Sequence, residues 1–100
     1  MKKHKVNLLL SAKADISEAR KWYCQFNNEL PIRFKEETRQ IIEALKLRPD
    51  AHAIRYKNVR FAQLNKFPYS IHYFIDKSTL TVNIIAVYHT SINPDKWILR

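Results

Sequence analysis

Asn65-Lys66-Phe67-Pro68-Tyr69-Ser70-Ile71-His72-Tyr73-Phe74-Ile75 is the stretch around which the rest of this chain is organised. After a polar turn, large apolar residues recur at every second position from Tyr69 to Ile75. This period of two predicts a β-strand with one face on a core. Pro68 has no backbone N–H, so it suits the first residue of a strand better than its interior.

A second alternating run follows and predicts a β-hairpin with the first. The polar loop between the two runs is residues 76–79. The face expected to pack together in the second run consists of Leu80, Val82, Ile84, Ala86 and Tyr88. His89 then falls on the opposite face, as the last residue of the strand.

Upstream of the hairpin, the pattern predicts a short strand and two helices. Residues 5–10 read as a strand with Val6, Leu8 and Leu10 on one face, and Ser11 as the cap of the first helix. Apolar residues then recur at helical spacing, at Ile16, Ala19, Tyr23, Phe26 and Leu30.

The chain breaks near Asn27-Asn28, and Pro31 suits the first turn of a second helix. The apolar stripe expected on that helix is Leu30, Phe34, Ile41, Ile42 and Leu45. Arg48-Pro49 ends it.

Residues 53–56 and 59–64 add strand candidates before the hairpin. The predicted fold is therefore one α+β domain over residues 1–100. It has an N-terminal strand, an antiparallel two-helix hairpin and a three- to four-stranded antiparallel sheet, with both helices on one face of the sheet. Tyr69, Tyr73 and Phe67 are expected in the core between them.

The composition limits the function. A formal net charge of +9 indicates an anionic partner, either nucleic acid or an acidic protein, with a merely solvated basic surface as the alternative. The chain has no glycine, which argues against Walker or dinucleotide phosphate loops. The one cysteine, Cys24, allows no internal disulfide and fits a reducing cytoplasm.

Other classes of function are also disfavoured. No apolar run approaches the roughly 20 residues that span a bilayer, so no membrane association is expected. The four histidines and Cys24 lack the close spacing of metal ligands, so we expect neither a metal nor a cofactor.

The positive charge is concentrated in the sheet half of the chain. Residues 51–75 contain four unopposed cations besides His52 and His72, namely Arg55, Lys57, Arg60 and Lys66. Such residues suit a phosphate backbone or an acidic protein tail, or they only keep the sheet soluble. His72 joins them as a candidate, expected half-exposed on the face away from the helices.

An ordered set of short motifs resembles the RelE/ParE toxin superfamily over nearly the whole chain. The motifs are Ala14-Asp15-Ile16, Trp22-Tyr23, Pro31-Ile32-Arg33-Phe34, Val59-Arg60, Phe67 to Tyr73, Val87-Tyr88-His89, Asn93-Pro94 and Trp97. The resemblance implies a small bacterial cytoplasmic toxin that a cognate antitoxin binds and silences. Trp22 and Trp97 are candidates for the antitoxin contact, with packing as the alternative for Trp97.

The superfamily has two main branches. The RelE-like branch resembles a ribosome-dependent mRNA endonuclease, and the ParE-like branch resembles a poison of DNA gyrase. Where members of the superfamily often carry arginine this chain has Ser70 and Ile92, and each change removes a cation that would stabilise the phosphate in the transition state. The ParE-like mode is therefore the leading hypothesis.

Two alternatives remain open. In an mRNA endonuclease, His89 would be the general acid and Arg60 a second catalytic residue, with Lys57 or Lys66 on the phosphate. His89 could instead be only an exposed or capping residue. The other alternative is a non-toxic basic module that binds nucleic acid or protein.

Overall fold

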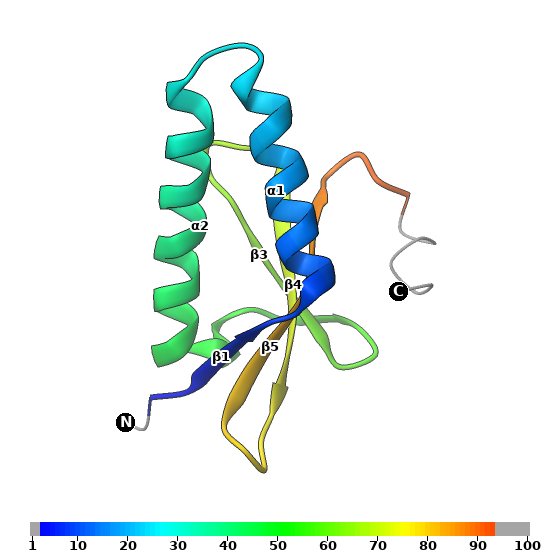
Figure 1. Ribbon diagram of the computed structural model, residues 1–100. Helices are drawn as coiled ribbons and strands as arrows, with labels where there is room; N and C mark the ends of the chain where they lie inside the picture. Colours follow the sequence, from blue (N-terminus) through cyan, green and yellow to red (C-terminus); the bar gives the residue numbers. More distant parts are fainter. Residues whose placement is uncertain (1–2, 94–100) are drawn as a thin grey trace.

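The computed structural model describes residues 3–93, which form two helices packed on a mixed β-sheet (Figure 1). The elements in chain order are β1 (Lys5–Leu8), α1 (Leu10–Cys24), α2 (Glu29–Leu47), the 3-10 helix η1 (Pro49–Ala51), β2 (Ile54–Tyr56), β3 (Val59–Gln63), β4 (Tyr69–Asp76) and β5 (Thr81–His89). Within this part of the chain the strand order is β1-β5-β4-β3-β2. The predicted α+β architecture is confirmed.

One strand runs in a direction that the sequence did not predict. β1 pairs in parallel with β5, whereas the other neighbours in the sheet are antiparallel. The two helices bring the chain back to the end of the sheet where β1 starts. β3 then runs in the same direction as β1, and β4 runs in the opposite direction. β5 again has the direction of β1, so these two neighbours are parallel.

The expected alternation along β5 is wrong beyond Ile84. The register with β4 shifts there, because Tyr73 faces Ile84 while His72 faces Ala86, so Ile85 is an extra residue. Such a bulge reverses the faces of all residues that follow it in the strand. Val82 and Ile84, which precede the bulge, lie in the main core. Val87, which follows it, is turned to the same side and lies there too. Leu80 is also misassigned, because it adopts the left-handed region (φ 51°) in the turn before β5.

The core is built around aromatic rings between the helices and the sheet. Phe34 of α2 is fully buried, and its ring centre lies 5.3 Å from that of Phe67 and 5.2 Å from that of Tyr69. Tyr23 of α1 contacts both rings of the sheet side, at 4.9 and 6.2 Å. The predicted core positions of Phe67, Tyr69 and Tyr73 are confirmed.

The predicted helical stripes are mostly confirmed. Leu30, Ile41, Ile42, Phe34 and Leu45 of α2 all pack on the core, as do Ile16, Ala19 and Tyr23 of α1. Phe26 does not, because α1 ends at Cys24 before reaching it, and 64% of Phe26 is exposed.

The start of α1 also differs from the prediction. β1 ends at Leu8, Leu10 is an exposed first residue of α1, and Ser11 lies inside the helix. Ser11 is therefore not the N-cap. Its hydroxyl instead donates to the carbonyl of Ile85 at 2.7 Å, so this side chain joins the helix to the sheet.

Tyr73 ties β4 to the end of the helical hairpin. Its buried hydroxyl donates to the carbonyl of Pro49 at 2.6 Å, and burial raises the pKa of Tyr73 to about 12. Because the neutral phenol is favoured in the folded state, its contribution to stability is complete below pH 10, the ordinary value. It is lost as the pH rises towards 12.

We expect Tyr73→Phe to lower the free energy of unfolding at pH 7 by about 1 kcal/mol, since one buried hydrogen bond is lost. The same variant should lose less stability than the wild type between pH 10 and 12. Urea titrations at neutral and alkaline pH measure both effects. A variant whose alkaline loss equals that of the wild type contradicts this role, because Tyr23 and Tyr69, whose pKa values burial also raises, are present in both proteins.

Candidate functional site

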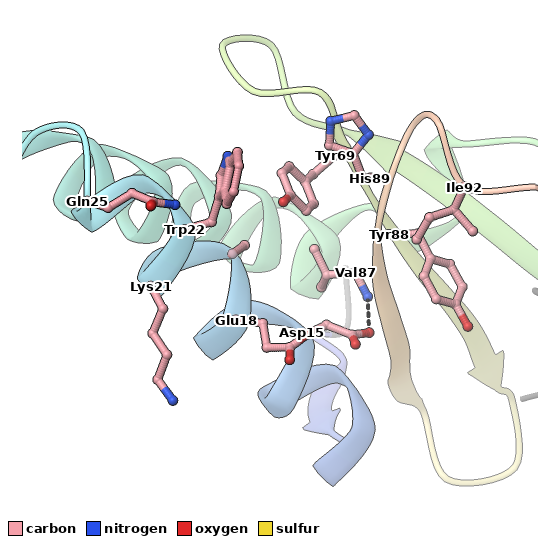
Figure 2. A pocket seen from close by; sticks show the side chains of 11 residues that line it. Asp15, Glu18, Lys21, Trp22, Gln25, Tyr69, Val87, Tyr88, His89 and Ile92 are labelled. Atoms are coloured by element: carbon pink, nitrogen blue, oxygen red, sulfur yellow. Dashed lines mark hydrogen bonds between the residues drawn. The ribbon is translucent and has the colours of Figure 1, made fainter.

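An open groove of about 1120 Å³ runs between α1 and the end of β5 (Figure 2). Its residues come from α1, from the first residue of β4, and from β5 and the turn that follows it. They are Asp15, Glu18, Ala19, Lys21, Trp22, Gln25, Tyr69, Val87, Tyr88, His89 and Ile92. The groove thus unites several motifs that are far apart in the sequence.

The groove exists because β1 is shorter than β5. The last bond of the pair joins the N–H of Leu9 to the carbonyl of Ile84, after which the chain turns into α1. Beyond this point the outer edge of β5 meets side chains of α1 in place of a strand. Asp15 accepts a hydrogen bond from the backbone N–H of Val87 at 2.9 Å, across 72 positions of the sequence (Figure 2).

Exposed aromatic surface forms the upper wall of the groove. Trp22 is 56% exposed, and its ring meets that of Phe26 edge to face at 5.3 Å. Across from α1, the ring of Tyr69 meets that of His89 edge to face at 5.2 Å. Trp22, a candidate for the antitoxin contact, is thus exposed, whereas Trp97 lies outside the described residues.

His89 has a defined orientation at the end of β5. Its Nδ1 accepts a hydrogen bond from the backbone N–H of Ser91 at 3.1 Å, and the hydroxyl of Ser91 lies 2.7 Å from the same atom. Since a backbone N–H can only donate, Nδ1 is the acceptor, and the neutral ring carries its hydrogen on Nε2. The bulge at Ile85 places this ring on the helix side of the sheet, opposite Tyr69.

The expectation that His72 is half-exposed is wrong. It does lie on the face away from the helices, yet only 1% of it is exposed. Its ring stacks on Phe61 at 3.9 Å and meets Tyr88 edge to face at 4.9 Å, while Nδ1 lies 3.3 Å from the hydroxyl of Tyr56. Rings from three neighbouring strands enclose this imidazole, a grouping that local alternation cannot reveal.

The four predicted cations do not converge. Arg60 shares the helix side with its partner Tyr73 and donates to the carbonyl of His52 at 2.5 Å. Arg55 lies over the ring of Phe61 on the other face, 5.7 Å from its centre.

Lys57 and Lys66 stand beyond opposite ends of β3. Lys57 occupies the turn before this strand, with φ of 48°. The backbone N–H of Lys66, after the strand, donates to Glu37 of α2 at 3.1 Å.

One face of α1 contacts the edge of β5 and lines the groove, and the sequence analysis did not predict this. The residues on that face are Ser11, Asp15 and Trp22. They follow one another at i, i+4 and i+11 on α1, so they share one face of the helix beside the apolar stripe. That spacing is the signal that could have identified a polar face directed at the sheet edge.

Within residues 3–93, no three His, Cys, Asp or Glu side chains gather closely enough to hold a metal ion. Over the same residues, no helix combines the length and the apolar character needed to cross a bilayer.

Comparison with known proteins gives a consistent result. The family model for the ParE toxin of the type II toxin-antitoxin system, parDE, matches residues 6–94. No curated protein sequence matches the chain.

Solved structures share the fold at low identity. The toxin-antitoxin complex RelBE2 from Mycobacterium tuberculosis is similar with a TM-score of 0.66 and 19% identity, over 89% of this chain and 93% of that chain. The chromosomal ParDE system from P. aeruginosa is similar with a TM-score of 0.67 and 14% identity, over 91% and 100%. The isolated E. coli RelE toxin has a TM-score of 0.57 and 11% identity, over 96% and 94%.

We expect Asp15→Ala to lower the free energy of unfolding by about 1–3 kcal/mol, because a part-buried N–H loses a charged acceptor. Asp15→Asn keeps an acceptor oxygen and should lose less. Glu18→Ala, an exposed residue one turn further along α1, is the matched control and should change stability little. Chemical denaturation measures all three. Equal stability of Asp15→Ala and the control would show that the contact with Val87 does not hold α1 on β5.

Proposed function

This chain belongs to the family of ParE toxins of type II toxin-antitoxin systems, and we propose that it stops growth by acting on DNA gyrase without cleaving RNA. The toxin assignment is the premise, and the choice of target is the proposal. Gyrase is proposed as the target because the sequence resembles the ParE-like branch of the superfamily. We propose the cytoplasm, where gyrase works, as its place of action.

The separation of Arg60 from His89 is the observation that carries this proposal. A site that cleaves RNA must hold its general acid and its cation within hydrogen-bond reach of one phosphate. Arg60 lies on β3 and pairs with Tyr73 of β4. His89 lies on β5, the other neighbour of β4, and pairs with Tyr69. These two partners are four positions apart, which is about 13 Å along β4. Arg60 and His89 thus start from separate places on the sheet, and Arg60 is held on the carbonyl of His52, which favours a mode of action that does not need the two side chains on one phosphate.

The face of the sheet away from the helices supports the same proposal. Ser70, at the position where members of the superfamily often carry arginine, is buried opposite Tyr88. Beside it lie His72 and its ring partner Phe61. Arg55 adds a cation at the edge, over Phe61. An aromatic surface of this kind offers little charge to stabilise a phosphate during cleavage.

A cognate antitoxin is the partner that this family implies. Two of the similar structures belong to toxin-antitoxin systems, although they share less than 20% identity with this chain. A formal charge of +9 favours association with an acidic partner.

Regulated expression in a bacterium tests the mode of action. We expect growth arrest with DNA-damage signalling, while primer extension finds cellular transcripts uncut. Because Nε2 of His89 has no role in the proposed mode, His89→Ala should inhibit supercoiling by purified gyrase within about two-fold of the wild type. The adjacent antitoxin gene should restore growth in both cases.

Two results contradict this proposal. Codon-phased cleavage that disappears in His89→Ala indicates the mRNA endonuclease. Normal growth on expression of the folded wild type indicates the non-toxic binding module.

A further inference from the structure

We propose that the end of the sheet at which β1 and β3 begin binds the phosphate backbone of double-stranded DNA. The binding side chains are five exposed cations, called here the basic rim, namely Lys3, Lys5, Arg48, Lys57 and Lys77. This inference rests on the proposed action on gyrase, an enzyme whose substrate is DNA, and it adds a direct contact between the toxin and that DNA.

The strand pairing brings three of these lysines to one end of the sheet. Lys5 pairs with Thr81, the first residue of β5. Thr81 also faces Asp76, the last residue of β4, so Lys77 follows at the same end. Because β3 is antiparallel to β4, the turn between β2 and β3, which contains Lys57, lies at this end as well.

The end of α2 adds the other two cations. The N–H of His4 donates to the carbonyl of Lys46 at 2.8 Å, so α2 ends beside the start of β1. Lys3 directly precedes this bond, and Arg48 is the C-cap of α2. Figure 1 shows the end of α2, the start of β1 and the β4–β5 turn together on the lower side of the molecule.

Much of the unbalanced positive charge in the described part of the chain lies at this end. Residues 10–47, which hold both helices, carry seven lysines and arginines against six carboxylates. The three ion pairs between described residues are all on α2, and none of them holds a side chain of the basic rim. Two carboxylates, Asp50 and Asp76, lie at this end, so five cations against two carboxylates leave a net charge of +3.

The backbone that carries two of the lysines is fixed by tight turns. Lys57 has a φ of 48°, a value at which glycine or asparagine is the usual residue. The Asp76 carboxylate accepts the N–H groups of Ser78 and Thr79 at 3.0 and 3.4 Å, which closes the turn that contains Lys77. Phosphate binding therefore has to restrict only the side chains of these lysines, which lowers its entropic cost.

The spacing and the type of cation favour DNA over an acidic protein. Neighbouring strands lie about 4.8 Å apart, so β1 and the turn before β3, three strand spacings away, are about 14 Å apart. This exceeds the roughly 12 Å width of the major groove, so the two ends of the basic rim can reach phosphates on both sides of it. Four of the five cations are lysine, which is depleted in protein interfaces but common in phosphate contacts.

Binding of the purified protein to a short DNA duplex at several salt concentrations tests this inference. The double variant Lys57→Asn/Lys77→Gln should flatten the slope of log affinity against log salt concentration by about 1.8, because two phosphate contacts are lost. Its affinity at 0.1 M salt should fall at least about ten-fold. Asparagine is chosen for Lys57 because it tolerates the positive φ.

The matched control, Lys13→Gln/Lys35→Gln, removes two exposed lysines from the helices and changes the net charge by the same amount. It should keep the slope and the affinity of the wild type, and melting curves should show both double variants folded. In a supercoiling assay with purified gyrase, the rim variant should require about ten-fold more protein for the same inhibition, as its loss of DNA affinity implies.

Equal loss of affinity in the rim variant and the control overturns this inference, because binding would then depend on net charge alone. Tighter rim-dependent binding of a polyglutamate peptide than of the duplex also overturns it, in favour of an acidic protein. Gyrase inhibition by a wild type that binds no duplex overturns the DNA contact and leaves the proposed target standing. Rim-dependent DNA binding without gyrase inhibition supports the contact and removes only the proposed target.

Discussion

The hydrogen bond from the Val87 N–H to the Asp15 carboxylate is the contact on which the arrangement of this molecule depends. β1 is too short to cover the edge of β5, and a carboxylate on α1 takes the place of the missing strand. An uncovered backbone donor beside a core would cost about 1–3 kcal/mol. The same bond fixes the distance between helix and strand, and therefore the width of the groove beside them.

The bulge at Ile85 determines what faces that groove. Without the extra residue, Val87 and His89 would lie on the open face of the sheet with His72. With it, they turn toward α1 and meet Tyr69. A single inserted residue thus separates the histidine at the strand end from the open face, where Ser70 and His72 lie.

The cations of the sheet show why charge in a sequence does not define a site. Arg60 holds the carbonyl of His52, and Arg55 lies over Phe61. Both keep their charge, but contacts within the chain hold them on opposite faces of the sheet, so the two cations do not form one binding site. Similar folds at 11–19% identity can therefore differ in chemistry, because the fold fixes positions and the side chains at those positions fix the function.

The sequence by itself determined the elements, the core rings around Phe34 and the family, because periodicity and ordered motifs reflect which face of each element avoids water. Only the tertiary structure decided the parallel placement of β1, the burial of His72 and the position of His89. These features depend on contacts between residues far apart in the chain, such as Asp15 and Val87, 72 positions apart. The alternation of residues along one strand carries no information about such distant partners. A bulge that exchanges the two faces of a strand therefore cannot be recognised from the pattern of apolar residues.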